Sequence, residues 1–431
     1  MLSRADLTGI RLPQANFRPN IATMPSRVPL LERLGPLYVM VICILLSQSL
    51  EAFTARQIGF GIMGKMTLAL TGLATLLIFI PTLLLRTRSF LFTVWVNLPF
   101  LCYTAIALCS TVWSITPSDT LKAAITLMCF HGVGLAMASV FSWRSIWVGI
   151  AWALLLLGAG SVLVIPYDGI MSGENAGAMR GLWMEKNAAG EACAIGALAC
   201  AIVAIADRNP LYFLGTAFML CCILLAKAMG AFATCFVALS FLIFTETIRR
   251  GPVRFFMGGW FAVSVVAVLG LIVATMGLEA AGILGKDTTL TGRTAIWPTV
   301  IDFIKERPLL GYGFQSFWEE GTVTKTTVME RANFEAHNAH NSYFEMMLGI
   351  GAVGSFFVWF GILRCIFQSS TALVGGSDAR RFALPFLIFG LLLSLSESML
   401  GDSAGLAAFV LGILVPKVAL SHAISKGHFK G

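Results

Sequence analysis

The side chains best suited to chemistry in this sequence are a few cations and one histidine in polar stretches. Arg180 and Lys186 fall in one such stretch, and Arg293 and His340 fall in another. An arginine guanidinium can bind a phosphate through two parallel hydrogen bonds, whereas lysine supplies a point charge. A neutral imidazole can take a proton near pH 7. These residue types are suited to holding a phosphate-bearing substrate and removing a proton from a hydroxyl group.

Each of these residues also has a plainer interpretation. An isolated loop arginine is usually solvated, and His340 can be a polar cap at the start of a helix. A metal site would need His337, His340 and a carboxylate such as Glu335 or Glu345, but no third ligand stands at a recognisable spacing. We therefore expect neither a metal nor a cofactor.

The composition indicates the kind of protein that positions these residues. Of the 431 residues, 57% are hydrophobic and only 12% are charged, with a net charge of +8 and a mean hydropathy of +0.83. Soluble globular proteins carry about 25% charged residues. The ten cysteines all lie in apolar runs and form no CxxC motif, so neither a disulfide framework nor a zinc site is expected. The composition excludes a soluble one-core enzyme and predicts a polytopic membrane protein.

Apolar runs long enough to cross a bilayer predict an all-α integral membrane protein with twelve transmembrane helices. The runs cover about residues 36–53, 66–85, 90–112, 121–141, 146–165, 188–206, 211–229, 231–248, 256–278, 342–363, 382–400 and 404–420. Most of the 30 Lys and Arg residues, Arg364 and Lys417 among them, fall in the cytoplasm if the N-terminus is inside. We expect residues 1–35 as a cytoplasmic tail without a cleavable signal peptide, residues 36–420 as one transmembrane domain, and residues 421–431 as a second cytoplasmic tail.

Two polar loops then lie on the outer face, at residues 166–186 and 279–341. Apolar residues at helical spacing predict a helix in the larger loop, ended by the chain before Pro308. Trp297 and Phe303 on this helix are expected to anchor in the membrane interface. The two loops gather the cations and the histidine on one membrane face, where a lipid-linked diphosphate in the outer leaflet would meet them.

Four short motifs give the chain a resemblance to a known family. The large loop contains GRTAIWPTVIDFIKERPLLGYGFQSFW and, at its end, HNAHNSYFEMMLGIGAVG. The shorter loop contains RGLWMEKNAAGE, and the segment after the third predicted span reads TVWSITPSDTLKAA. In this order the motifs resemble the O-antigen ligase and polymerase superfamily, and most of all its bacterial exopolysaccharide polymerases.

The resemblance implies a membrane glycosyltransferase of the bacterial inner membrane, with its active site facing the periplasm. Its donor would be a glycan linked to a polyprenyl diphosphate of the undecaprenyl type, used without a metal. By motif position, the residues implied as catalytic are His340, Arg293 and Arg180. The candidates for binding the substrate are Lys186, Asn187, Lys227, Asn341, Tyr343 and Glu345.

One motif departs from the family pattern. Many members carry Ser-x-Ser-Arg between the seventh and eighth spans, whereas this chain has LLAKAMGAFAT, with Lys227 as its only cation. Lysine does not replace the bidentate contacts of arginine. Asn341 and Tyr343 can orient a substrate, but capping and packing are the favoured interpretation for both. Glu345 and Glu397 near the outer boundary are functional candidates, although Glu397 can simply be hydrated. His131, in the middle of a span, is expected to be a buried, hydrogen-bonded residue.

Three functions remain open. A polymerase would join lipid-linked repeat units, and the resemblance favours this reaction over a ligase that passes glycan to a lipid A core. Both would act within the lipid bilayer on a polyprenyl-diphosphate-linked donor and a glycan acceptor, and a polymerase would work with a flippase and a chain-length regulator. Twelve glycine-rich spans are also typical of secondary transporters, although the two halves of the chain show no internal repeat. Nucleic acid is not an expected partner, because the basic residues flank spans and do not interleave with aromatic residues.

Overall fold

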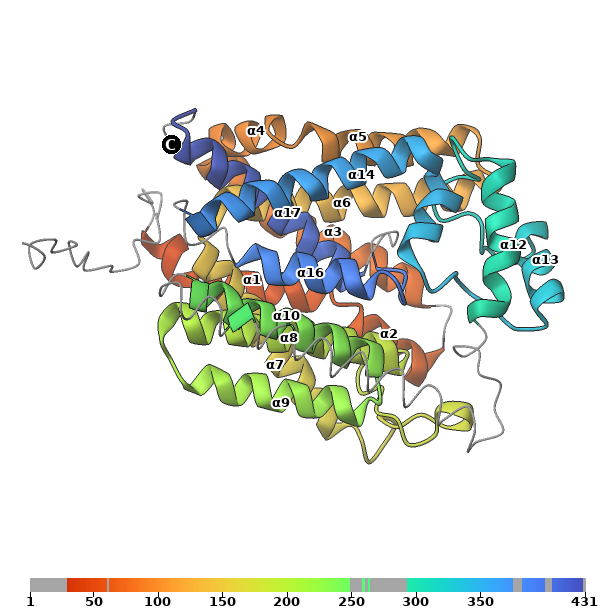
Figure 1. Ribbon diagram of the computed structural model, residues 1–431, viewed down its shortest axis with the longest axis horizontal. Coiled ribbons are helices and arrows are strands. Elements are labelled where there is room, and N and C mark those ends of the chain that lie inside the picture. The colour runs from red at the N-terminus through yellow and green to blue at the C-terminus, as the bar shows by residue number, and fades with distance from the viewer. Residues whose placement is uncertain are drawn as a thin grey trace, which may run out of the picture.

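A computed structural model describes residues 29–59, 62–248, 293–374, 382–399 and 405–428, with the single residues 258, 259 and 263. This part of the chain is all helices and loops, apart from one isolated bridge between Ile170 and Met179. The helices labelled in Figure 1 are α1 (Pro29–Leu45), α2 (Ser49–Ile58), α3 (Met63–Leu85), α4 (Thr87–Trp95), α5 (Leu98–Cys109), α6 (Pro117–Val140), α7 (Trp143–Leu163), α8 (Lys186–Asp207), α9 (Leu211–Leu225), α10 (Met229–Ile248), α12 (Arg293–Glu306), α13 (Val323–Ala332), α14 (Ser342–Val374), α16 (Ala383–Leu393) and α17 (Leu406–Ser425).

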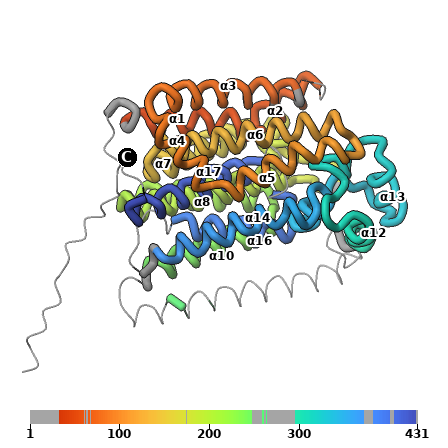
Figure 2. Tube along the Cα trace, turned by 90° about the horizontal axis from the view of Figure 1, so that it is seen from above, coloured from red at the N-terminus to blue at the C-terminus, as the bar shows by residue number. Residues whose placement is uncertain are grey.

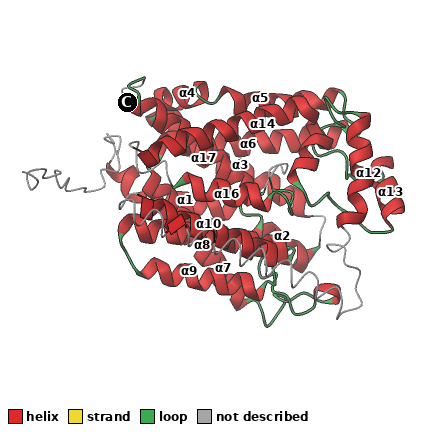
Figure 3. Ribbon diagram, in the orientation of Figure 1, coloured by secondary structure: helices red, strands yellow, loops and turns green. Residues whose placement is uncertain are grey.

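Most of these helices run side by side along the longest axis of the molecule, as Figures 1 and 2 both show. Helices α12 and α13 lie at one end of this bundle, and so does the irregular connection between α7 and α8 (Figure 3). We call this end the loop end. The described parts of the two predicted outer loops therefore lie at the same end of the bundle. Residues 279–292 of the larger loop lie outside the described residues.

By length and composition, eight helices of the described part could cross a membrane. Helices α4 and α5 form a ninth span if the 79° bend between them falls within one crossing. Two further predicted spans correspond to apolar helices that are short, since α9 has 15 residues and α16 has 11. The predicted span at 256–278 lies outside the described residues, apart from 258, 259 and 263. The chain is thus an all-helical multi-pass membrane protein, but the predicted count of twelve spans is not confirmed.

Helix α16 is short because its predicted span is completed by irregular backbone. At 1.5 Å per residue it covers about 16 Å, roughly half of a bilayer's hydrocarbon core. Residues 394–399 continue in turns, and such backbone is tolerated at membrane depth where protein groups satisfy it. One such bond joins the amide of Ser342 to the carbonyl of Ser394 at 2.9 Å. At the two ends, α1 begins before the predicted boundary at residue 35 and α17 continues past residue 420.

The centre of the bundle is packed closely because small residues face neighbouring helices. In α8, alanines and glycines alternate with larger apolar residues, and an added Cβ at Gly190 would lie 2.2 Å from the Cβ of Ala228. His131 lies in the same core with 5% of its surface exposed, and its Nδ1 is 2.6 Å from Oγ1 of Thr104. The expectation of a buried, hydrogen-bonded histidine is confirmed.

Two of the basic residues assigned to the cytoplasmic side, Lys417 and Arg364, also bind backbone carbonyls at the ends of helices. Nζ of Lys417 donates to the carbonyls of Ala138 and Phe141 at 2.8 and 2.5 Å, at the carboxyl end of α6. Nη1 of Arg364 donates to the carbonyl of Val96 at 2.7 Å, where α4 ends. The last carbonyls of a helix have no partner within the helix, so these cations satisfy them.

Helix α14 is interrupted at Gly351, whose φ of 61° and ψ of −166° are not helical. An added Cβ at this residue would lie 2.3 Å from the carbonyl group of Leu309. Backbone groups on both sides of the break bond to the segment at residues 308–313, which passes alongside it. These bonds join Tyr312 N to Leu348 O (2.7 Å), Gly313 N to Gly349 O (3.0 Å), Ala352 N to Pro308 O (2.8 Å) and Val353 N to Leu309 O (3.1 Å).

The larger loop forms a small core of its own. The predicted helix is present as α12 and ends at Glu306, as expected before Pro308. Trp297 and Phe303, expected to anchor in the membrane interface, are partly buried and pack on this core: Trp297 lies edge-on to Phe344, and Phe303 contacts Tyr312. Their anchoring in the interface stays a prediction. Burial and the nearby carboxylate of Glu306 raise the pKa of Tyr312, whose hydroxyl stays protonated 2.9 Å from that carboxylate.

Candidate active site at the loop end of the bundle

Arg180 lies in an ion-pair network centred on Asp168, in the connection between α7 and α8. Its guanidinium pairs with the carboxylate of Asp168, and its Nε donates to the carbonyl oxygen of the same residue at 3.1 Å. Nε of Arg56 lies 3.3 Å from the carboxylate, to which Gln57 also donates at 3.3 Å. Two arginines therefore share one carboxylate, and the network keeps a net positive charge.

Arg56 and Arg180 differ in how much surface they present. The side chain of Arg56, in the last turn of α2, is 4% exposed and donates to the carbonyls of Trp183 and Gly181 at 2.8 and 2.7 Å. Arg56 thus fixes the backbone that directly follows Arg180. The side chain of Arg180 is 23% exposed, so Arg180 is the arginine of this network that an anionic substrate can reach.

The sequence did not single out Arg56 or Asp168 because neither belongs to a motif. One signal for Arg56 was present, since an arginine beside the apolar residues of a predicted outer boundary is a functional candidate by position. Asp168 carried no such signal. Its importance depends on the contacts that bring α2 against the α7–α8 connection.

Lys186 and Asn187 are the first two residues of α8, and both side chains are half-buried. The first amide groups of a helix carry partial positive charge, which adds to the charge of Lys186. Lys227 lies in the turn between α9 and α10 with a φ of 52°. Its exposed side chain donates from Nζ to the carbonyl of Ala176 at 3.2 Å, so it reaches the connection that carries Arg180.

His340 forms a second cluster with Glu397, from the irregular segment after α16. Nδ1 of His340 lies 3.5 Å from Oε2 of Glu397, and their side chains are 22% and 20% exposed. The backbone of His340 has a φ of 47°, a conformation that costs free energy for a residue with a side chain. Asn338 supports it by accepting the His340 amide at 2.7 Å, and Ser398 donates to the same Asn338 oxygen at 3.1 Å.

Glu397 is therefore not simply hydrated, which was one of the two sequence interpretations. A carboxylate beside Nδ1 can hold the imidazole ring in one orientation and stabilise it when it is protonated. His337 is different, because its side chain is 64% exposed and it lies 3.7 Å from the exposed Glu335. Among the described residues, no three His, Cys, Asp or Glu side chains lie close enough to hold a metal ion.

Two other predicted residues, Asn341 and Tyr343, form the frame of this cluster. The side-chain oxygen of Asn341 accepts the amides of Tyr343 and Phe344 at 3.0 and 3.2 Å, which caps α14. The hydroxyl of Tyr343 donates to the carbonyl of Leu391 at 3.0 Å, and its ring stacks on Trp359. Of the two roles that the sequence left open for Asn341 and Tyr343, these contacts are those of capping and packing.

Glu345 links the His340 turn to the loop core. One of its carboxylate oxygens accepts the amide of Ala339, and the other accepts the indole N–H of Trp318 at 3.1 Å. The carbonyl of Ala339 in turn accepts the indole N–H of Trp297 at 3.0 Å. Glu345 therefore positions the residue before His340.

Arg293 begins α12, one turn before Trp297. Its side chain lies outside the described part of the structure, so its predicted contact with a diphosphate stays a prediction. The contact of Trp297 with Ala339 nevertheless ties the first turns of α12 to the His340 turn.

The turn between α9 and α10 lies between the two clusters. Lys227 reaches the α7–α8 connection, while an added Cβ at Gly230 would lie 3.5 Å from Oγ of Ser396, the neighbour of Glu397. Ala228, between them, packs on Gly190 one turn into α8. The α9–α10 turn thus contacts both the connection that carries Arg180 and the segment that carries Glu397.

Comparison with known proteins agrees with the resemblance read from the motifs. Residues 214–359 match the model of a family described as O-antigen ligase. The exopolysaccharide production protein ExoQ of Rhizobium meliloti (strain 1021) is 37% identical over 79 residues, which make up 17% of this chain and 18% of that relative. The family match runs from α9 into α14 and includes Lys227, Arg293 and His340, whereas Arg180 and Asp168 precede it.

Proposed function

We propose that this chain, whose residues 214–359 match the O-antigen ligase family, is a membrane glycosyltransferase that acts on polyprenyl-diphosphate-linked glycan. The observation that carries the proposal is the corner at the α9–α10 turn. This turn contacts one segment that carries cations suited to a diphosphate and another that carries the partner of a histidine suited to taking a proton. Arg180 and Lys227 come from one side, and the pair of His340 and Glu397 comes from the other.

The donor brings its own leaving group, because its anomeric carbon already bears a diphosphate. An acceptor hydroxyl attacks this carbon, a new C–O bond forms, and the bond to the diphosphate oxygen breaks with its electron pair. Arg180, Lys227, Lys186 and Arg293 neutralise the charge that develops on the diphosphate. His340 takes the proton of the attacking hydroxyl, and Glu397 stabilises the resulting imidazolium.

Of the two reactions that share these motifs, we propose polymerisation of repeat units over ligation to a lipid A core. The likeness to a protein named for exopolysaccharide production favours it. We place the loop end at the periplasmic face of the inner membrane, with residues 1–35 and 421–431 as tails of one transmembrane domain. A flippase that delivers the donor and a regulator of chain length would then be working partners.

The decisive experiment incubates the purified protein with lipid-linked repeat units extracted from the producing cells. We expect glycans of two or more repeats, separated by gel or mass spectrometry. Conversion of His340 to Gln removes the base, and general-base catalysis contributes roughly 100- to 10,000-fold to a rate. Conversion of the exposed His337 to Gln is the matched control and is expected to leave the rate unchanged.

Three outcomes would change the proposal. A wild-type protein that leaves single repeats unchanged but transfers glycan to a lipid A core is a ligase. Full synthesis by His340→Gln and Arg293→Ala proteins that remain in the membrane would remove the enzyme hypothesis and favour a transporter. An equal loss in His337→Gln and His340→Gln would mean that the loop, and not one imidazole, is needed.

A further inference from the structure

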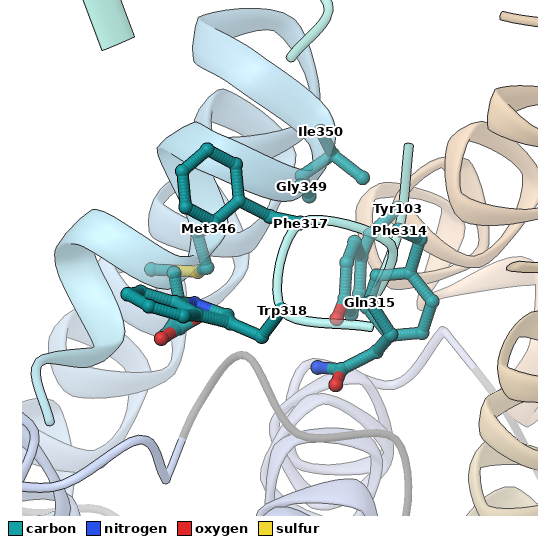
Figure 4. Close-up of a pocket in the computed structure, with 9 residues that line it drawn as sticks. Tyr103, Phe314, Gln315, Phe317, Trp318, Met346, Gly349 and Ile350 are labelled. Carbon is teal, nitrogen blue, oxygen red and sulfur yellow. The ribbon is translucent and has the colours of Figure 1, made fainter. Parts of the chain in front are cut away.

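A small pocket beside the His340 turn takes no part in the proposed reaction. Its volume is about 10 Å³, which is room for a group the size of one water molecule. Four aromatic residues and two polar ones line it, together with three residues of α14, Met346, Gly349 and Ile350 (Figure 4). The residues used below are Tyr103, Phe314, Gln315, Phe317, Trp318 and Glu345.

Trp318 is held in a fixed orientation at this pocket. Its indole N–H donates to one oxygen of Glu345 at 3.1 Å, and its ring lies edge-on to Phe317 at 5.0 Å between centroids. The ring is half-buried, so part of it remains accessible from outside. Because the other oxygen of Glu345 accepts the amide of Ala339, Trp318 is linked through one carboxylate to the residue that precedes His340.

Gln315 occupies a position that would suit glycine better. Its φ is 59°, and it follows Gly311 and Gly313, which also have positive φ. A side chain in this conformation costs free energy, and such residues gather at functional sites. Figure 4 shows that its amide and the ring of Trp318 extend to different sides of the loop that carries them. Gln315 thus places a side-chain amide at the pocket, at a position where glycine would adopt the backbone conformation at a lower cost in free energy.

We propose that this pocket is the subsite for the acceptor sugar, with Trp318 and Gln315 as its recognition residues. The inference rests on the proposed function and names the place where the acceptor is held. A pyranose ring has an apolar C–H face, which packs on an aromatic ring, and hydroxyl groups at its edge, which bond to an amide. The pocket is too small for a whole ring, so the sugar lies across the mouth and a single hydroxyl group enters.

This placement puts the acceptor next to the base. Glu345 joins Trp318 to Ala339, and His340 follows directly, so a sugar on Trp318 can present a hydroxyl to the imidazole. The donor diphosphate is expected on the other side of His340, toward Arg180 and Lys227. Donor and acceptor would therefore be recognised by different residues, and their binding can be measured separately.

The test uses two substrates whose concentrations vary independently. The donor is the extracted lipid-linked repeat unit, and the acceptor is the oligosaccharide released from the same lipid. Gln315→Gly removes the amide and relieves the backbone strain. Asn333→Gly is the matched control, because Asn333 also has a positive φ of 48°, in the same loop, but is exposed and does not line the pocket.

We expect Gln315→Gly to raise the KM for the acceptor roughly 3- to 10-fold, which is the effect of one lost hydrogen bond. The KM for the donor should stay the same, and the melting temperature should not fall. Trp318→Leu is expected to raise the acceptor KM further, and Trp318→Phe to raise it less because a ring remains. Asn333→Gly should match the wild type in both constants.

The failure of this inference differs from failure of the proposed function. If the wild type transfers glycan but Gln315→Gly and Trp318→Leu keep its acceptor KM, the subsite is wrong and the enzyme stands. If both variants raise the KM for the donor as much as the KM for the acceptor, the two residues act on the fold, and the proposed subsite is also wrong. If the wild type makes no product from any donor, the proposed function fails and the subsite fails with it.

Discussion

Asp168 holds two arginines whose tasks differ. Nη1 and Nη2 of Arg56 donate to backbone carbonyls, so this residue fixes the α7–α8 connection, whereas Arg180 keeps accessible surface. One carboxylate cannot neutralise two guanidinium groups. The network therefore keeps a net positive charge, and Arg180 is the arginine through which a diphosphate could reach it. Asp168 is accordingly a positioning residue, and Arg180 is the residue expected to touch substrate.

A double-mutant cycle on Arg180 and Asp168 tests this division. Arg180→Ala should lower kcat/KM roughly 10- to 150-fold, the loss of about 1.5–3 kcal/mol from a charge-assisted contact. Asp168→Asn should lower kcat/KM by a smaller factor. The double variant should lower kcat/KM by less than the product of the two single factors, because both residues act through one contact. The measurement is polymerisation rate against donor concentration.

The control for this cycle is Asp207→Asn, since Asp207 pairs with Arg144, whose side chain is 53% exposed. Exposed ion pairs contribute little, so its kcat/KM should equal that of the wild type. If the effects of Arg180→Ala and Asp168→Asn simply multiply, Asp168 does not act through Arg180 and the positioning role is wrong.

Sequence motifs indicated some of the individual site residues, whereas others could be identified only from their contacts in the folded protein. Arg180 and His340 were identified as candidates because each stands in a short motif, and their roles stay predictions. Arg56 and Asp168 were missed because their pairing joins segments far apart in the chain. Glu345 was predicted from its depth in the membrane, but its bonds to Ala339 and Trp318 depend on the folded loop.

Among the helices, α14 depends most on one residue. Gly351 allows the helix to break and the segment at 308–313 to bond with both halves. Its φ and ψ lie in a region that is essentially restricted to glycine. Because the same segment leads into Phe314 and the loop core, the break joins the transmembrane bundle to the residues around His340.

Gly351→Ala is expected to destabilise the protein. The strain contributes about 1–3 kcal/mol, and the clash of the new Cβ with Leu309 adds to it. Thermal unfolding in detergent should show a lower melting temperature, with lower polymerisation in membranes. Gly361→Ala, in the same helix with no atom near the added Cβ, should be neutral or slightly stabilising. Equal melting temperatures for the two variants would mean that the break is not needed.

Hydropathy predicted where helices occur but not where they are interrupted. A run of apolar residues has the same composition whether or not its backbone is continuous, so α4 with α5, α14 and α16 all read as unbroken spans. Each interruption persists because distant groups satisfy the freed backbone, as Arg364 does for Val96. Such partners are visible only in the folded molecule.

For the molecule as a whole, the arrangement of helices separates two ends. Helices α7 and α8 have 21 and 22 residues, each long enough for a bilayer, and their connection with Asp168 and Arg180 lies at the loop end. Their other ends carry Arg144 and Arg208. Basic residues in short loops favour the cytoplasm, so the loop end is expected to face the periplasm.

Reporter fusions test this orientation directly. Alkaline phosphatase, which is active only outside the cytoplasm, should be active when fused after Tyr167 or after Glu320, since both residues are exposed at the loop end. The same enzyme fused after Arg208 should be inactive, and a fluorescent protein at that position should be fluorescent. Activity after Arg208 with none after Tyr167 would place the candidate site in the cytoplasm, and the periplasmic reaction would then be excluded. Activity after Tyr167 but not after Glu320 would separate the two loops and with them the Arg180 and His340 clusters, which no single active site could then join.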